Sequence, residues 1–155
     1  MRATKTILAI FFLLLINNCV FAQADNPKYN KHLADSLGGD DYGMKKYILV
    51  ILKSGPVEIT DKKKRDSLFA GHLQNIVRLA SIGKLVVAGP MDRNDKNYRG
   101  IFILNVSTAE EARKLLATDP TIEAKLLDAE IYGWYGSAAL PMYLPASEAI
   151  EKKKF

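Results

Sequence analysis

The sequence predicts an α+β fold of the ferredoxin-like βαββαβ type, an antiparallel four-stranded sheet with two helices on one face. Three observations support this prediction. Apolar runs bounded by turn residues alternate with two amphipathic stretches in the order strand, helix, strand, strand, helix, strand. The first and third apolar runs are the most continuous, as expected of two central strands. The length of the chain suits one domain.

The N-terminal segment 1–22 is predicted to be a secretory signal peptide. Two basic residues precede a short apolar run at 7–16, and small residues follow up to Ala22. We therefore expect cleavage after Ala22 and export to the periplasm or the medium. Lipid attachment at Cys19 is the less favoured alternative, because Asn and Ile rather than small residues precede that cysteine.

Charge and cysteine content exclude several classes of function. The chain has a net charge of +5, and loss of Arg2 and Lys5 with the signal peptide leaves +3. That value is mildly basic and says little about partners. Because the domain is expected to be exported, nucleic acid is not an expected partner. Cleavage after Ala22 also removes the single cysteine, so the mature chain has no disulfide and no thiolate. We expect no nucleic acid partner and no membrane span once the signal peptide is removed.

Three segments are predicted beyond the signal peptide. Residues 23–44 are polar and rich in Gly and Asp, so they are expected to form a leader. The domain is expected over residues 45–136. Residues 137–155 contain two prolines and end in a basic stretch, and we expect this tail to pack along the surface and then fray.

The first strand is predicted at 46–53, where the run KYILVILK is apolar almost throughout. Thr60 or Asp61 is expected to cap the next helix, and Gly83 to end it. Asn75 falls on the polar half of this helix. The apolar half is predicted to hold Leu68, Phe69, Leu73, Ile76, Val77, Leu79 and Ala80.

The second half of the domain is predicted to contain three strands and a helix. The strands are expected at 84–90, 100–106 and 128–136, the first of them running into a turn at Gly89-Pro90. Ser107 and Glu110 have the spacing of a capping box that opens the second helix, and Asp119-Pro120 ends it. Because both helices cover one face of a sheet whose central strands are apolar on both faces, the other face needs a cover. We expect a second copy of the chain there, giving a homodimer with a barrel-like interior.

His72 is the residue with the greatest potential for chemistry. The only other histidine, His32, lies in the polar leader and is expected to be solvated. His72 lies within the apolar half of the first helix, four residues from Leu68 and from Ile76. Two interpretations follow: a core histidine bonded to a carbonyl, or a general acid/base that titrates near neutral pH.

A series of motifs in this region resembles the YCII-related domain family. The match runs over roughly residues 46–135 and follows the pattern H-L-x-x-(I/L)-x-x-L-x-x-x-G-K-L-x-x-A-G-P, a glycine-led strand, an E-E-A helix and D-P. The matching residues are His72, Leu73, Leu79, Gly83, Lys84, Leu85, Ala88, Gly89, Pro90, Gly100, Glu110, Glu111, Ala112, Asp119 and Pro120.

The resemblance implies a dimeric α+β barrel, related in fold to muconolactone isomerase, with a histidine–aspartate pair in a pocket. That pair corresponds to His72 and Asp119. At least one family member removes halogen from a hydroxylated aromatic ring, and most have no assigned activity. Some relatives carry a hydroxyl residue after the glycine of the third strand, whereas here Ile101 follows Gly100.

Asp119 also has two interpretations. Followed by Pro120, it has the pattern of a helix N-cap; next to a histidine, its carboxylate would fix the tautomer of the imidazole. Arg99 is a candidate for gripping an anionic ligand, and Gly89 and Pro90 for shaping the rim of a pocket.

The function expected from these features is an exported, cofactor-independent isomerase or lyase acting on a small cyclic or aromatic organic acid. His72 would move the proton and Asp119 would orient it. A non-catalytic dimeric module that binds a small ligand is the alternative, and a purely structural role for both residues is the third. No cofactor and no metal is expected, since metal-ligand spacing, phosphate loops and nucleophile elbows are absent from the sequence.

Overall fold

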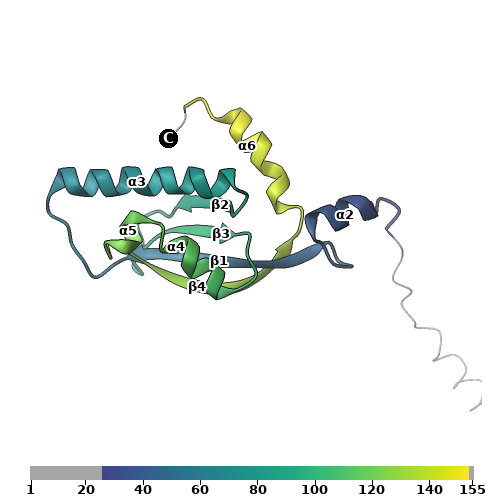
Figure 1. The fold of residues 1–155 in the computed structure, drawn as a ribbon, viewed down its shortest axis with the longest axis horizontal. Helices are drawn as coiled ribbons and strands as arrows, with labels where there is room; N and C mark the ends of the chain where they lie inside the picture. Colours follow the sequence, from purple (N-terminus) through teal and green to yellow (C-terminus); the bar gives the residue numbers. More distant parts are fainter. Residues whose placement is uncertain (1–25, 154–155) are drawn as a thin grey trace, which may run out of the picture. The chain divides into compact units, whose positions relative to one another are not determined.

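An antiparallel four-stranded sheet forms the centre of the computed structural model, which describes residues 26–153 (Figure 1). The predicted signal peptide and Cys19 lie outside the described residues. The strand order is β2-β3-β1-β4. The strands are β1 (Met44–Ser54), β2 (Leu85–Pro90), β3 (Tyr98–Leu104) and β4 (Leu127–Ser137). The two most continuously apolar runs are thus the central strands, and the predicted ferredoxin-like α+β fold is confirmed.

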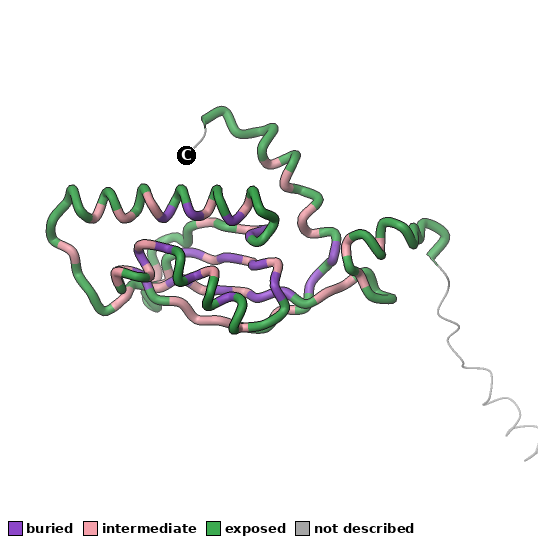
Figure 2. Tube along the Cα trace, viewed as in Figure 1, coloured by how far each residue is buried: buried purple, intermediate pink, exposed green. Residues whose placement is uncertain are grey.

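Three helices accompany the sheet: α3 (Lys62–Ser81), α4 (Ala109–Leu116) and α5 (Pro120–Glu123). Alternate residues of β1 enter one hydrophobic core together with residues from α3, α4 and the other strands. Figure 2 shows the buried positions concentrated along the strands and on parts of the helices. The fully or nearly fully buried members include Val50, Leu79, Phe102, Leu104 and Leu116.

The ends of α3 agree with the predicted signals. The Asp61 side chain accepts a hydrogen bond from the backbone N–H of Lys64, at 3.2 Å. Gly83 follows the helix with a φ of +67°, a conformation that glycine adopts without strain.

The division of α3 into an apolar and a polar half is only partly correct. Asn75, placed on the polar half, is buried, whereas Phe69, Leu73 and Val77 are 39–50% exposed. Asn75 is buried because it has hydrogen-bond partners, one of them from outside the helix, and Phe69 and Leu73 are exposed because a cavity lies beneath the first half of the helix, both described below. Val77 borders a separate hollow between α3, β2 and α6 (Leu144–Ile150).

The capping box of α4 begins one residue later than predicted. Thr108, rather than Ser107, is the N-cap, and its Oγ1 accepts from the backbone N–H of Glu111 at 3.2 Å. The same hydroxyl donates to Glu111 Oε2 at 2.9 Å. Two adjacent hydroxyl residues followed by two glutamates offer two equivalent registers, and periodicity alone does not choose between them.

The segments on either side of the domain contain more structure than expected. The polar leader includes the helix α2 (Lys31–Leu37), and Lys45 Nζ of β1 donates to the Leu37 carbonyl at 3.1 Å. The tail forms a 3-10 turn, η2 (Leu140–Tyr143), and the helix α6 (Leu144–Ile150). The Tyr143 hydroxyl donates to the Val86 carbonyl at 2.5 Å and so occupies an acceptor on the edge strand β2.

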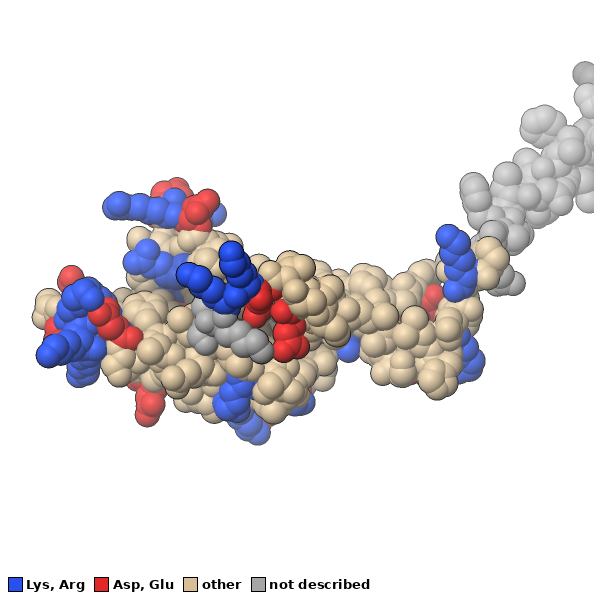
Figure 3. Space-filling model, turned by 90° about the horizontal axis from the view of Figure 1, so that it is seen from above, with Lys and Arg blue, Asp and Glu red and all other residues tan. Residues whose placement is uncertain are grey.

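On the face that Figure 3 shows, basic and acidic side chains lie in several separate groups. On this face, Lys and Arg cluster near the start of α3, where acidic side chains lie among them. Lys62 in this first turn forms an ion pair with Asp66 at 2.5 Å. None of the helices within residues 26–153 is long and apolar enough to cross a bilayer.

Candidate functional site

A cavity of about 480 Å³ lies between the first half of α3 and the ends of β2 and β3. Ala88, Gly89 and Gly100 leave this space open because they carry little or no side chain. A Cβ on Gly100 would lie 2.7 Å from the Gly89 carbonyl oxygen, so the close approach of β2 and β3 requires glycine there. The lining is almost entirely apolar, and His72 and Arg99 are its ionisable side chains. Such a cavity suits a small, largely apolar ligand.

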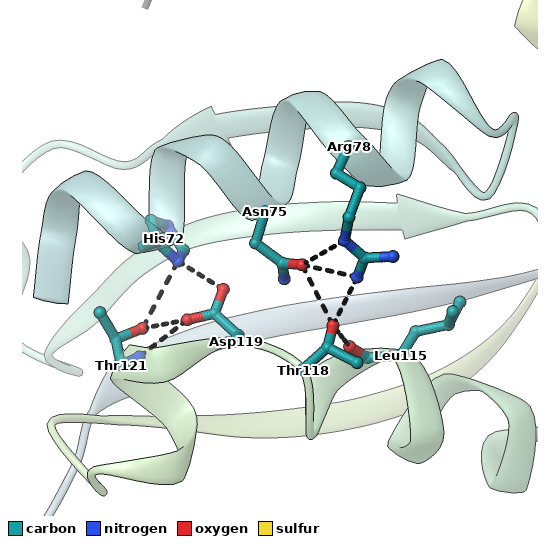
Figure 4. A network of polar contacts seen from close by, with 7 residues as sticks. All are labelled: His72, Asn75, Arg78, Leu115, Thr118, Asp119 and Thr121. Atoms are coloured by element: carbon teal, nitrogen blue, oxygen red, sulfur yellow. Dashed lines mark hydrogen bonds and ion pairs between the residues drawn. The ribbon is translucent and has the colours of Figure 1, made fainter.

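His72 projects from α3 at this cavity and is bonded to Asp119. Its Nδ1 lies 2.7 Å from Asp119 Oδ2 (Figure 4). Both side chains are buried, with exposed fractions of 11% for His72 and 1% for Asp119. The two residues are far apart in sequence, and the packing of α3 against α5 brings them together.

Asp119 combines both of the roles considered from the sequence, because its two oxygens have different partners. Oδ2 contacts His72, while Oδ1 accepts from the Thr121 backbone N–H at 2.9 Å and from the Thr121 hydroxyl at 2.6 Å. Asp119 is therefore the N-cap of α5 and the hydrogen-bond partner of His72 at once.

These contacts determine the charge of Asp119 and, through it, the tautomer of His72. Burial raises the pKa of Asp119, but hydrogen bonds from His72 and Thr121 outweigh it, so the pKa lies below its ordinary value. An ionised carboxylate only accepts hydrogen bonds. Nδ1 must then carry a hydrogen, and in the neutral ring Nε2 holds a free lone pair.

His72 lines the cavity while its Nδ1 contacts Asp119, and we infer from this that Nε2 faces the cavity. Nε2 makes no hydrogen bond to the residues the structure describes, and among these residues no fully buried polar side-chain atom lacks a partner. The ring is held between two aromatic side chains: Phe102 stacks on it at 5.9 Å between centroids, and Phe69 meets it edge-on at 6.3 Å. The imidazole is thereby fixed with one nitrogen on the carboxylate and the other toward the ligand space.

The other predicted site residues also line this cavity. Arg99 is exposed at the cavity, and its guanidinium has no hydrogen bond or ion pair to residues 26–153. Gly89 and Pro90 form part of the wall, but they belong to β2 rather than to the predicted turn. Pro90 is tolerated there because β2 is an edge strand. His32 is exposed, as expected.

Residues 118–121 contribute more to the site than sequence reasoning suggested. Thr121 is fully buried, and its hydroxyl contacts both residues of the pair. Its Oγ1 lies 3.4 Å from His72 Nδ1 and donates to Asp119 Oδ1. The sequence Asp-Pro-Thr at a helix start could have indicated the contact between Asp119 and Thr121. An N-cap aspartate accepts a hydrogen bond from the backbone N–H two positions further along. Asn75, Arg78 and Thr118 form a second polar network whose members only tertiary packing brings together.

Comparisons with curated proteins and with solved structures gave the following results. A search of curated proteins gives no match to this chain. Among solved structures, 5-chloro-2-hydroxyhydroquinone dehydrochlorinase from Burkholderia phenoliruptrix AC1100, in complex with 2,5-dihydroxybenzoquinone, is similar at 23% identity and a TM-score of 0.42. The match covers 57% of this chain and 92% of that one. Within residues 26–153 there is no group of three or more His, Cys, Asp or Glu side chains placed to hold a metal.

The family assignment rests on the sequence of the domain itself. The model of the YCII-related domain matches residues 46–134, which span β1 through most of β4 and include His72, Asp119 and all the residues that line the cavity. The match covers more than half of the chain, and its motifs coincide with the strands and helices of the structure. The protein is a member of the YCII-related domain family.

Proposed function

We propose that this protein is a cofactor-independent acid/base enzyme of the isomerase or lyase type, acting on a small cyclic or aromatic organic acid. The observation that carries the proposal is the buried His72–Asp119 pair, whose free ring nitrogen opens into an apolar cavity. A base held in this way, next to space for a ligand, is the arrangement that proton transfer requires.

The proposed chemistry uses one proton. Nε2 of His72 takes a proton from a carbon whose C–H bond is made acidic by a neighbouring carbonyl or ring. The imidazolium that forms is stabilised by the Asp119 carboxylate on Nδ1. Return of the proton to a different carbon gives isomerisation, and loss of a leaving group from the carbanion gives elimination. Neither outcome needs a redox group.

Arg99 is proposed to hold the acidic group of the substrate. It is the one permanent positive charge among the cavity-lining residues, and a guanidinium grips a carboxylate through two parallel hydrogen bonds. Gly89 and Pro90 are proposed to shape the rim beside it. The apolar side chains Phe69, Leu73 and Phe102 then face the ring of the substrate.

Exchange of substrate hydrogen with solvent tests this proposal without knowledge of the product. The protein is incubated in D₂O with a panel of cyclic and aromatic carboxylic acids, and NMR detects deuterium entering at carbon. We expect at least one compound to exchange, and His72→Gln to lower the rate about 10²- to 10⁴-fold, the usual contribution of a general base.

His32→Gln is the matched control, since it removes the other, exposed histidine and should leave exchange unchanged. Binding of a panel compound without any exchange, with affinity lost in His72→Gln, would instead support the alternative of a ligand-binding module. If His72→Gln only lowers the melting temperature, neither function stands.

We further propose that the protein is exported, on the basis of residues 1–22, and that it acts as a homodimer. The support for a dimer is the sheet face opposite α3. Leu49, Ile51, Ile101 and Ile103 lie on this face with their side chains only partly buried, in register across β1 and β3. Tyr132 on the neighbouring β4 is 48% exposed. A contiguous apolar patch of this kind marks an association surface.

A charge placed in this patch should separate the subunits. Ile51→Lys would place a charge from each subunit in the apolar contact, and we expect the dimer dissociation constant to rise at least about 100-fold. Analytical ultracentrifugation measures this constant. Val57→Lys, at an exposed loop position, is the control and should remain dimeric. A wild-type protein that sediments as a monomer at high concentration would refute the dimer.

A further inference from the structure

Three consecutive residues at the junction of α4 and α5, the last of them the first residue of α5, each contact α3, in reverse order along that helix. Thr118 contacts Asn75 and Arg78, Asp119 contacts His72, and Pro120 lies against Gly71. The catalytic contact proposed above is the middle one of the three. Asp119 is therefore held in place from both sides.

The contact on one side depends on a buried amide. Asn75 is 7% exposed, and a buried polar side chain is costly unless it is hydrogen bonded. Its Oδ1 accepts from Arg78 Nη2 at 2.7 Å and Nε at 3.2 Å, and lies 3.1 Å from Thr118 Oγ1. Arginine only donates, so the Asn75 atom that faces it must be the oxygen.

Arg78 links the two elements. Its Nη2 also lies 2.7 Å from Thr118 Oγ1, so its two hydrogens bridge the Asn75 amide oxygen and the Thr118 hydroxyl oxygen (Figure 4). Thr118 has one hydroxyl hydrogen, and the Leu115 carbonyl at 2.7 Å is a closer acceptor for it than Asn75. The guanidinium thus fixes the residue just before Asp119 to the turn of α3 just after His72.

The contact on the other side is steric. A Cβ on Gly71 would lie 2.8 Å from Pro120 Cγ, so only glycine allows this approach of α5 to α3. This packing limits the distance between the elements but does not prevent them from sliding along each other. The directional hydrogen bonds of Arg78 supply that restraint.

We propose that Asn75, Arg78 and Thr118 are positioning residues, which hold Asp119 in register with His72 so that Nδ1 keeps its hydrogen and Nε2 stays free. This inference rests on the proposed function, in which the alignment of Asp119 with His72 keeps Nε2 free to act as a base. None of the three residues lines the cavity, and none is expected to touch the substrate.

Thr118→Val tests the proposal because it replaces the hydroxyl with a methyl group of the same size. Thr118→Ser is the matched control, since it restores the hydroxyl. NMR of ¹⁵N-labelled protein measures the exchange of the His72 Nδ1 hydrogen with water and the protonation of both ring nitrogens. We expect Nδ1 exchange about tenfold faster in Thr118→Val, with wild-type behaviour in Thr118→Ser.

Arg78→Met provides the second variant. Arg78 and Thr118 are exposed, so neither change empties the core, and Arg78→Met removes the same bridge while it keeps the aliphatic stem. If Arg78 and Thr118 only stabilise the fold, the substitutions will lower the free energy of unfolding and leave the hydrogen exchange at His72 Nδ1 of the folded protein unchanged. Wild-type Nδ1 exchange in both variants would overturn the positioning role. Absence of a hydrogen on Nδ1 in the wild type would instead overturn the proposed function.

Discussion

Replacing Asp119 with Asn is expected to lower the rate of substrate hydrogen exchange about 10³- to 10⁴-fold, with little loss of folded protein. An Asn side chain fills the same volume, but its NH₂ group can donate to Nδ1 of His72. Nδ1 then becomes the acceptor, and the ring hydrogen moves to Nε2, which faces the cavity. The base is lost although every ring atom stays in place. The D₂O exchange assay measures the effect.

Asp92→Asn is the control for this substitution. Asp92 is exposed in the loop between β2 and β3 and is not part of the cavity lining, so the same chemical change there should leave the rate unaltered. An unaltered rate in Asp119→Asn itself would mean that Asp119 is a helix cap and that it plays no part in setting the tautomer of His72.

Asp119→Ala is expected to lower the free energy of unfolding at neutral pH by about 3 kcal/mol. The change removes the cap of α5 and leaves Thr121 N–H, the Thr121 hydroxyl and His72 Nδ1–H without their acceptor. Urea denaturation measures the loss. A loss below about 1 kcal/mol would mean that water replaces the carboxylate in this pocket.

The difference in free energy of unfolding between wild type and Asp119→Ala should be smaller at acidic pH. The pKa of Asp119 is lowered in the folded state, so its contribution to stability is fully present above the unfolded pKa of about 4. That contribution is lost as the pH falls through the lower folded-state pKa, because the unfolded chain binds the proton first. The gap between wild type and Asp119→Ala should therefore narrow below about pH 4. A gap that is constant with pH would contradict the hydrogen bonding of an ionised Asp119.

The strands and the ends of α3 could be predicted because their signals are local. Apolar runs between turn residues gave all four strands to within about two residues, a typical uncertainty for element ends. Asp61 and Gly83 marked the ends of α3, since capping depends on neighbouring residues alone. The capping register of α4 failed because Ser107 and Thr108 offer the same chemistry one residue apart.

The burial of individual side chains on α3 could be predicted less well from the sequence. Asn75 has the helical position of a solvent-facing residue, and it gains a tertiary hydrogen-bond partner only through the approach of Thr118, 43 positions further along the chain. Likewise, Phe69 and Leu73 were predicted as core, but the small residues of β2 and β3 leave a cavity beneath them. Periodicity identifies which side of a helix faces the sheet, and the shape of the opposing surface decides how tightly it is filled.

The most direct test of the account is a long-range ¹H–¹⁵N correlation spectrum of the His72 ring in the neutral form. We expect a hydrogen on Nδ1 and a bare Nε2 in the wild type, and the reverse in Asp119→Asn. His32, exposed in the leader, provides the reference for an unrestrained ring in the same spectrum. A wild-type spectrum with the hydrogen on Nε2 would contradict the account, since the nitrogen that faces the cavity would then have no lone pair with which to accept a proton.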